Sequence, residues 1–264
     1  MPEVRSWARL GGWMGIAWPA LFIVVMVAAE MTYPPSHSTA EELAALAQPR
    51  AGHLSMLLHA LAAIIGLLGI SWAVALNSVL QSGRPSRAAT LAAVFGVAGF
   101  TVVTAMLIVQ GSVQTGIADQ FAKLTSDADR TATVAAFRSV RWVDLGLDFT
   151  WDIFIASSMI LFSVSMLRTR AFGKFWGLIG IVIAGVLFAL DMRSAPWPAE
   201  PDISPISFIW FIGVSIKMLL FARRQMEPHE WNRPERSAAL ILPNARSSSD
   251  HLAVLASKPD TSHS

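Results

Sequence analysis

The sequence of 264 residues contains no cysteine, which excludes disulfide bonds, thiolate nucleophiles, iron–sulfur clusters and cysteine-based zinc sites. Charged residues are also scarce, at 14% of the chain, whereas a soluble domain has about 25%. The net charge of +2 is small and no basic run is interleaved with aromatic residues, so we expect no nucleic-acid partner.

Apolar side chains, in contrast, are abundant. Hydrophobic residues make up 54% of the chain, and its mean hydropathy is +0.52. Such a chain has too few polar side chains to cover a surface exposed to water. The composition therefore indicates a protein that is embedded in a lipid bilayer.

Six stretches are long and apolar enough to cross about 30 Å of hydrocarbon, which takes about 20 helical residues. Because backbone amides in hydrocarbon must bond within the segment, each stretch is expected to be a helix. We predict an all-α, polytopic membrane domain over residues 1–222, with six transmembrane helices in one bundle. The polar residues 223–264, rich in Pro and Ser, are predicted to form a flexible cytoplasmic tail. The predicted spans cover about residues 10–29, 54–80, 88–113, 143–167, 175–191 and 203–222.

The first apolar stretch has some features of a signal peptide. Arg5 and Arg9 precede it, and Val27, Ala28 and Ala29 near its end resemble a cleavage site. The apolar run of about 20 residues is, however, longer than the 7–15 residues of a typical signal peptide. We therefore expect the chain to keep this stretch as a membrane helix.

The distribution of Lys and Arg around the helix ends predicts the orientation in the membrane. Nine basic residues lie at one end of the predicted bundle, where the connections are short, and six lie in the longer connections at the other end. The nine are Arg5, Arg9, Arg84, Arg87, Arg168, Arg170, Lys174, Arg223 and Arg224. We therefore predict a multi-pass protein of the cell (inner) membrane with both termini in the cytoplasm.

Two features are predicted at the membrane boundaries. Residues 114–142 have a helical composition, which indicates a short helix on the outer surface. Tryptophans near the predicted helix ends are expected to form aromatic belts at headgroup level. These are Trp142, Trp151, Trp197 and Trp210 on the outer side and Trp7 and Trp176 on the inner side.

Glycines indicate where helices pack closely. Gly96 and Gly99, together with Thr101 and Thr104, predict a tightly packed face on the third span. Gly11 and Gly15 match the spacing of a close-packing motif on the first span, which is a weaker signal in a chain with many glycines.

Three aspartates in the fourth span lie on one stripe of the helix. Asp144, Asp148 and Asp152 are spaced i, i+4 and i+8. Counting 20 residues back from Arg168 places Asp144 outside the membrane, Asp148 at the interface and Asp152 one turn inside. Because an ionisable group at hydrocarbon depth costs about 2.5–3.5 kcal/mol, we expect Asp152 to pair with a neighbouring helix. That pairing could belong to a functional site or to a structural hydrogen bond.

Polar residues of several other spans are predicted at nearly the same depth. We therefore predict an outward-opening polar vestibule with Asp152 at its floor. Its rim would be formed by Asp148, His59, Gln110, Glu30 and Asp191. The alternative is that helix ends are polar wherever they meet headgroups, and we prefer it for Glu30, Asp144 and Asp191.

Carboxylates and a histidine in a vestibule could hold a cation, relay protons or bind a cationic substrate. The leading functional hypothesis is a non-enzymatic protein that binds or passes a small polar solute or cation. The nearly apolar inner halves of the spans weaken transport. One alternative is an intramembrane enzyme with Asp152 and Asp148 as acid and base, together with His59. Another is a sensor or scaffold that acts through its tail. No spacing typical of a metal, haem or nucleotide site is present.

The second half of the chain carries recognisable short motifs. They are Trp151-Asp152-Ile153-Phe154, Leu167-Arg168 followed by Phe172-Gly173, the Pro-rich segment 196–202, and Trp210. On these residues, within 142–220, the sequence resembles a group of bacterial six-helix membrane proteins. The resemblance implies the same six-helix architecture. Because the group has no established activity, it implies no catalytic residue.

Overall fold

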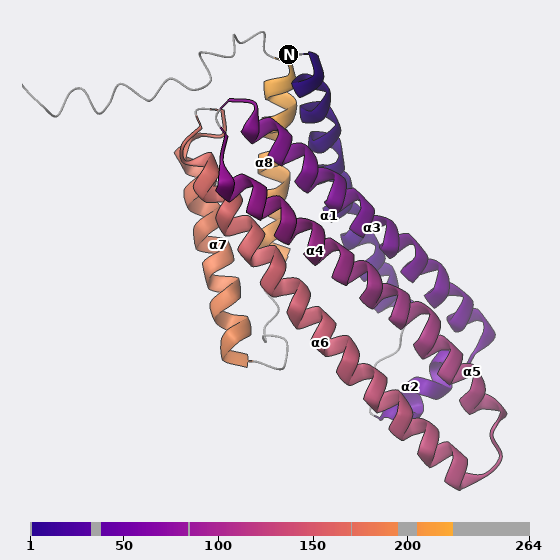
Figure 1. The fold of residues 1–264 in the computed structure, drawn as a ribbon. Helices are drawn as coiled ribbons and strands as arrows, with labels where there is room; N and C mark the ends of the chain where they lie inside the picture. Colours follow the sequence, from indigo (N-terminus) through magenta and orange to yellow (C-terminus); the bar gives the residue numbers. More distant parts are fainter. Residues whose placement is uncertain (1, 33–37, 84, 170, 195–204, 224–264) are drawn as a thin grey trace, which may run out of the picture. The chain divides into compact units, whose positions relative to one another are not determined.

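A computed structural model describes residues 2–32, 38–83, 85–169, 171–194 and 205–223 (Figure 1). These residues are almost entirely helical, and no strand occurs among them. Six of the helices are long and apolar enough to cross a membrane, which confirms the predicted all-α, polytopic fold. The predicted tail lies outside the described residues, apart from its first residue, Arg223.

The six membrane helices are α1 (Pro2–Thr32), α3 (Pro49–Gln81), α4 (Arg87–Ile108), α6 (Asp127–Met166), α7 (Gly173–Ser194) and α8 (Pro205–Arg223). Four of the six, α1, α3, α6 and α7, are longer than the predicted spans. A six-residue π-helix, η1 (Val109–Gln114), continues α4 and leads into the short helix α5 (Thr115–Lys123). The short helix α2 (Thr39–Leu46) lies between α1 and α3. Serines cap α2 and α4, since the side chains of Ser38 and Ser86 accept hydrogen bonds from the backbone of the first turn.

The six long helices form a closed ring of neighbours. α1 packs against α3 and α8, α3 against α4, and α4 against α6. α6 packs against α7, and α7 makes a smaller contact with α8, which closes the ring. Each helix can therefore turn one face toward a shared interior and another toward lipid.

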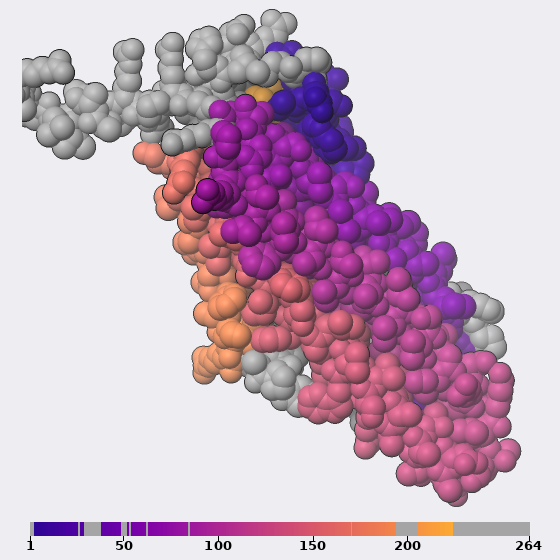
Figure 2. Space-filling view, in the orientation of Figure 1, coloured from indigo at the N-terminus to yellow at the C-terminus, as the bar shows by residue number. Residues whose placement is uncertain are grey.

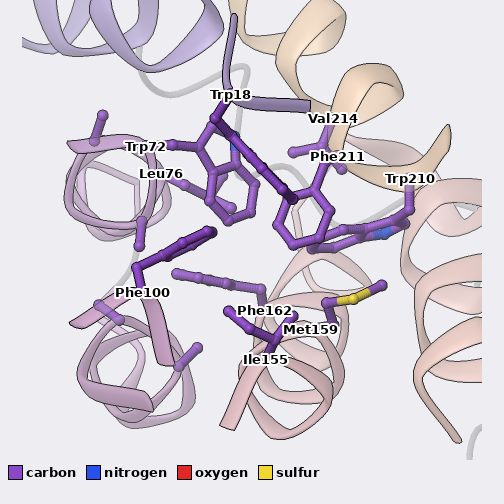
Figure 3. Close-up of a cluster of buried hydrophobic side chains, with 14 of the residues drawn as sticks. Trp18, Trp72, Leu76, Phe100, Ile155, Met159, Phe162, Trp210, Phe211 and Val214 are labelled. Atoms are coloured by element: carbon purple, nitrogen blue, oxygen red, sulfur yellow. The ribbon is translucent and has the colours of Figure 1, made fainter. Parts of the chain in front are cut away.

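Aromatic rings fill the interior of this ring (Figure 3). Trp18 makes edge-to-face contacts with Phe100 and Phe211, with centroid distances of 5.3 and 4.8 Å. Trp72 contacts Phe211 in the same way at 4.7 Å, and its Nε1 donates to the Ser215 hydroxyl at 3.0 Å. Such contacts stabilise more than apolar burial alone. The bundle therefore has an aromatic core.

This core corrects the predicted aromatic belt. Trp151 and Trp210 are buried inside the bundle instead of lying among headgroups, and Trp210 Nε1 donates to the Trp176 carbonyl at 2.9 Å. Trp142 is 52% exposed, as a belt residue would be. The predicted belt positions of Trp151 and Trp210 were therefore wrong. Counting residues along a helix gives the depth of a side chain in the membrane but not the face of the helix on which it lies.

Glycines mark the closest approaches between helices. A Cβ on Gly99 would lie 3.0 Å from the Ile155 side chain, and one on Gly96 would lie 3.0 Å from the Ser158 hydroxyl. The predicted packing face of the third span is thus confirmed for Gly96 and Gly99, which lie against α6. Thr104 instead lies against Gly66 of α3, and Thr101 is exposed. A Cβ on Gly15 would overlap Trp72 and Ser215, so this position also requires glycine.

A second, smaller core lies beyond the ring, where α2, α5 and the first half of α6 meet (Figure 1). We call α2, α5 and residues 127–141 of α6 the cap. Its buried side chains are Leu43, Leu46, Ala118, Phe121 and Phe137. The cap replaces the single surface helix predicted for residues 114–142. At 40 residues, α6 is about 60 Å long, twice the thickness of the hydrocarbon, so it forms both a span and part of the cap.

Candidate solute-binding site

A group of polar side chains lies where α3, η1 and α6 come together next to the cap. It consists of Ser55 and His59 on α3, Gln110 and Gln114 on η1, and Asp144 on α6. We call these five residues the polar cluster. Because the cluster joins three elements that are distant in sequence, it depends on the packing of the bundle.

Asp144 is the centre of the polar cluster. One of its carboxylate oxygens, Oδ2, accepts hydrogen bonds from Gln110 Nε2 at 2.8 Å and from Gln114 Nε2 at 3.4 Å. The other oxygen, Oδ1, is buried and has no hydrogen-bond partner among the described residues. A buried polar atom without a partner is costly, about 1–3 kcal/mol and more for a charged group. Such an atom in a native protein calls for a ligand, an ion or a water.

The π-helix η1 brings both glutamines to Asp144. π-Helical turns are rare, and they occur frequently at functional sites. Two hydroxyls bond to backbone carbonyls in and next to this segment. Thr115 donates to the Gly111 carbonyl at 2.6 Å, and Ser112 donates to the carbonyl of Ile108, the last residue of α4, at 2.5 Å. A glycine is needed at position 111, because a Cβ there would lie 2.5 Å from the His59 Cβ.

The hydrogen bonds of His59 determine its tautomer. Its Nδ1 lies 2.7 Å from the Ser55 carbonyl oxygen, and a carbonyl only accepts, so Nδ1 carries a proton. The second ring nitrogen, Nε2, is then an acceptor when the ring is neutral and a donor when it is charged. His59 also interacts electrostatically with the Asp144 carboxylate, as does Arg141 from the preceding turn of α6. The imidazole therefore lies close enough to the carboxylate for the two groups to interact electrostatically.

The structure brings together two of the six predicted site residues, His59 and Gln110. Asp144, which the sequence favours as an ordinary polar helix end, interacts with both of them. Its importance could have been inferred only from its pairing with Gln110 and Gln114, which no sequence spacing reveals. The hydrogen bond between Gln110 and Asp144 agrees with their predicted depths in the membrane, because both residues were expected near the outer ends of their helices.

The other predicted residues lie further from this centre or outside the described side chains. Asp148 and Asp152 are half-buried on α6, about 6 and 12 Å along the helix from Asp144. Asp191 is buried near the end of α7. Glu30 lies in the last part of α1, where its side chain is not described. A vestibule that joins all six residues stays a prediction.

The described side chains show whether a metal site or a polar path through the bundle is present. In the part of the chain that the structure covers, no three His, Asp or Glu side chains are placed to hold a metal ion. The side chains buried in the ring at mid-depth are mostly aromatic and aliphatic (Figure 3), with serines such as Ser158, which donates to the Ala92 carbonyl at 2.8 Å. The polar cluster therefore borders an apolar interior.

The chain is a multi-pass membrane protein whose apolar helices are suited to contact with lipid. Comparison with protein-family models, with curated proteins and with solved structures finds no match to it. The chemistry of the polar cluster is consequently the basis for a functional conclusion.

Proposed function

We propose that this protein binds a small organic cation at the polar cluster, below the cap. The observation that carries the proposal is the buried Oδ1 of Asp144, which has no partner among the described residues. Gln110 and Gln114 hold the other oxygen of the carboxylate and so fix its orientation. The charge, the fixed geometry and the open acceptor are what a cation-binding group requires.

The donor pattern of the ligand follows from the acceptors. Asp144 Oδ1 offers one acceptor, and we propose that Nε2 of neutral His59, whose ring interacts electrostatically with this carboxylate, offers a second. An alkylammonium group carries two or three N–H donors on one positive centre and would satisfy both. A divalent metal ion usually takes more protein ligands than these two residues supply. The site therefore favours an amine over a metal.

Binding is favoured over passage through the membrane. A transported cation would need polar groups along its whole path. Trp18, Trp72 and Phe100 instead fill the ring beyond the polar cluster and are fully buried. Asp148 and Asp152 would extend the polar stripe of α6 toward this aromatic core, and a ligand that reaches them would still end there.

The orientation of the site is part of the proposal. The predicted excess of Lys and Arg lies at the end of the bundle opposite the cap, and basic ends usually face the cytoplasm. On this basis the cap and the polar cluster face the outside of the cell membrane, with both termini in the cytoplasm. The solute would thus arrive from the extracytoplasmic side. The scaffold hypothesis depends on the tail, which, apart from its first residue, lies outside the described residues.

Thermal unfolding of the detergent-solubilised protein tests the proposal. We expect ethylammonium chloride, compared with sodium chloride at equal ionic strength, to raise the Tm of the unsubstituted protein. Tetramethylammonium, which has the charge but no N–H donor, should have a smaller effect. Asp144→Asn should remove the response, whereas the control Asp119→Asn, at an exposed carboxylate in α5, should keep it. An equal response of the Asp144→Asn protein would refute the site.

A further inference from the structure

α7 exposes more of its surface than any other membrane helix. Only 22% of its apolar stretch is buried, against 35–50% for the apolar stretches of the other five helices. Figure 2 shows α7 in orange along one edge of the molecule. Its exposed apolar residues Phe175, Leu178, Val182 and Val186 are spaced so that they lie along one face. We call these four residues the α7 stripe.

The length of the α7 stripe matches one leaflet of a bilayer. Eleven residues separate Phe175 from Val186, which corresponds to about 17 Å along a helix. Half of the hydrocarbon thickness is about 15 Å. An acyl chain that begins beside Phe175 would therefore lie along the whole stripe.

Basic side chains lie at the Phe175 end of this stripe. Arg168 and Lys174, both exposed, are at the two ends of the short turn that joins α6 to α7. Gly173 begins α7 with a φ of 73°, a value that favours glycine, and Lys174 and Phe175 follow it directly. Phe172 is buried and anchors the turn to the bundle.

A third basic residue belongs to the same end of the bundle. The hydroxyls of Ser86 and Ser165 lie 3.0 Å apart, which places the start of α4 next to the end of α6. The exposed Arg87 follows Ser86 directly. Residues 82–88 and 167–174 contain no acidic residue, so the charged side chains of these two segments are all basic.

We propose that the α6–α7 turn and the α7 stripe bind an anionic phospholipid. The lipid phosphate accepts hydrogen bonds from Arg168 and Lys174, and one acyl chain packs along the α7 stripe. Basic side chains at the cytoplasmic membrane surface attract anionic headgroups, and the apolar stripe supplies the matching chain contact. A second copy of the protein fits this face less well, because a two-fold dimer with parallel helices would bring the same basic residues of both copies together.

Lipid binding to the purified full-length protein tests this inference. Native mass spectrometry would count bound phosphatidylglycerol and, as the neutral comparison, phosphatidylcholine with the same acyl chains. The double variant Arg168→Gln/Lys174→Gln should bind phosphatidylglycerol about 30-fold more weakly, the loss expected from two basic residues near an anionic surface. The double variant Arg5→Gln/Arg9→Gln removes two exposed charges from α1 and should bind as the unsubstituted protein does.

Three results would overturn the proposal. One is phosphatidylglycerol affinity that survives in the Arg168→Gln/Lys174→Gln protein. Another is an equal loss in the Arg5→Gln/Arg9→Gln protein, which would show diffuse charge attraction instead of a site. The third is a dimer in which Val182→Cys crosslinks to its counterpart, because the stripe would then be covered by protein. A Tm measured for each variant separates lost binding from lost folding.

Discussion

The side-chain amide of Gln110 donates a 2.8 Å hydrogen bond to the carboxylate of Asp144 and so joins η1 to α6 across 34 residues of sequence. The same oxygen accepts from Gln114, which leaves the second oxygen buried without a described partner. This relationship fixes the orientation of the carboxylate, whose second oxygen is buried and keeps its capacity to accept a hydrogen bond. It is the structural basis of the proposed cation site.

The Gln110–Asp144 hydrogen bond is expected to contribute measurably to stability. Gln110→Leu should lower the free energy of unfolding by about 1–3 kcal/mol, because the bond has a charged acceptor. In an Asp144→Ala background the same substitution should cost much less, since the acceptor is already absent. Unfolding in detergent measures both, with Gln120→Leu on the exposed face of α5 as the control. Equal costs in the two backgrounds would contradict the pairing.

Gly15 is expected to tolerate no side chain. The added methyl group of Gly15→Ala would overlap Trp72 and Ser215, and overpacking of this kind costs about 1–3 kcal/mol. Gly185→Ala, where nothing lies within 4 Å, should be neutral or stabilising because alanine favours the helix. Thermal unfolding of the two variants side by side provides the measurement. If Gly185→Ala lowered the stability as much as Gly15→Ala, overpacking would not explain the effect at Gly15.

The cap is expected to depend on its apolar core and not on its ion pair. Phe137→Ala removes a fully buried ring and should destabilise the cap by about 3–5 kcal/mol. Arg141→Gln breaks the 2.7 Å pair with Glu42, but Arg141 is 50% exposed, so the cost should stay below about 1 kcal/mol. Hydrogen exchange in α2 and α5 distinguishes the two. Faster exchange in the Arg141→Gln protein than in the Phe137→Ala protein would show that the cap depends on the ion pair more than on the apolar core.

The Trp72 side chain is expected to connect α3 to α8. Trp72→Phe removes the hydrogen bond to Ser215 and leaves a cavity, so we expect a loss of about 1–3 kcal/mol in the free energy of unfolding. Trp13→Phe, at a ring that is 60% exposed, should change stability by less than about 0.5 kcal/mol. Unfolding curves in detergent, followed by near-UV circular dichroism, report both values. The expectation fails if the two substitutions cost the same.

The absence of cysteine makes the orientation testable by labelling. A single Ala122→Cys in the cap should react with a membrane-impermeant maleimide in intact spheroplasts, because the cap is proposed to face outward. A single Ser82→Cys in the α3–α4 turn should react only after lysis. Both positions are exposed, so accessibility differs only by side of the membrane. The opposite labelling pattern would place the termini outside.

Much of the fold could be predicted from the sequence because its signals are local. Hydropathy over about 20 residues is a property of one segment, so the number of spans did not depend on how they pack. The packing of Gly96 and Gly99 was also predictable, since small residues on one face permit close approach. The extension of α6 into the cap was missed because its first half is polar, and its helical structure is stabilised by burying Phe137 against α2 and α5.

The candidate site was only partly predictable. Counting residues placed His59, Gln110 and Asp144 near one level of the membrane, but height does not determine which side chains meet. The rotation of each helix about its axis determines which side chains meet. In this protein the π-helix turns Gln110 and Gln114 toward Asp144. The roles of Asp152, Asp148, Glu30 and Asp191, and the resemblance to bacterial six-helix proteins, stay predictions.

The amino-acid sequence by itself determined that this protein lies in a membrane and crosses it with six helices, since both follow from the free energy of placing each segment in hydrocarbon. Only the tertiary structure decided which faces of those helices meet. It placed Trp151 and Trp210 in the core, closed the six helices into a ring around aromatic side chains, and left one oxygen of Asp144 buried beside His59. Such pairings arise from packing between distant segments, which no single segment encodes.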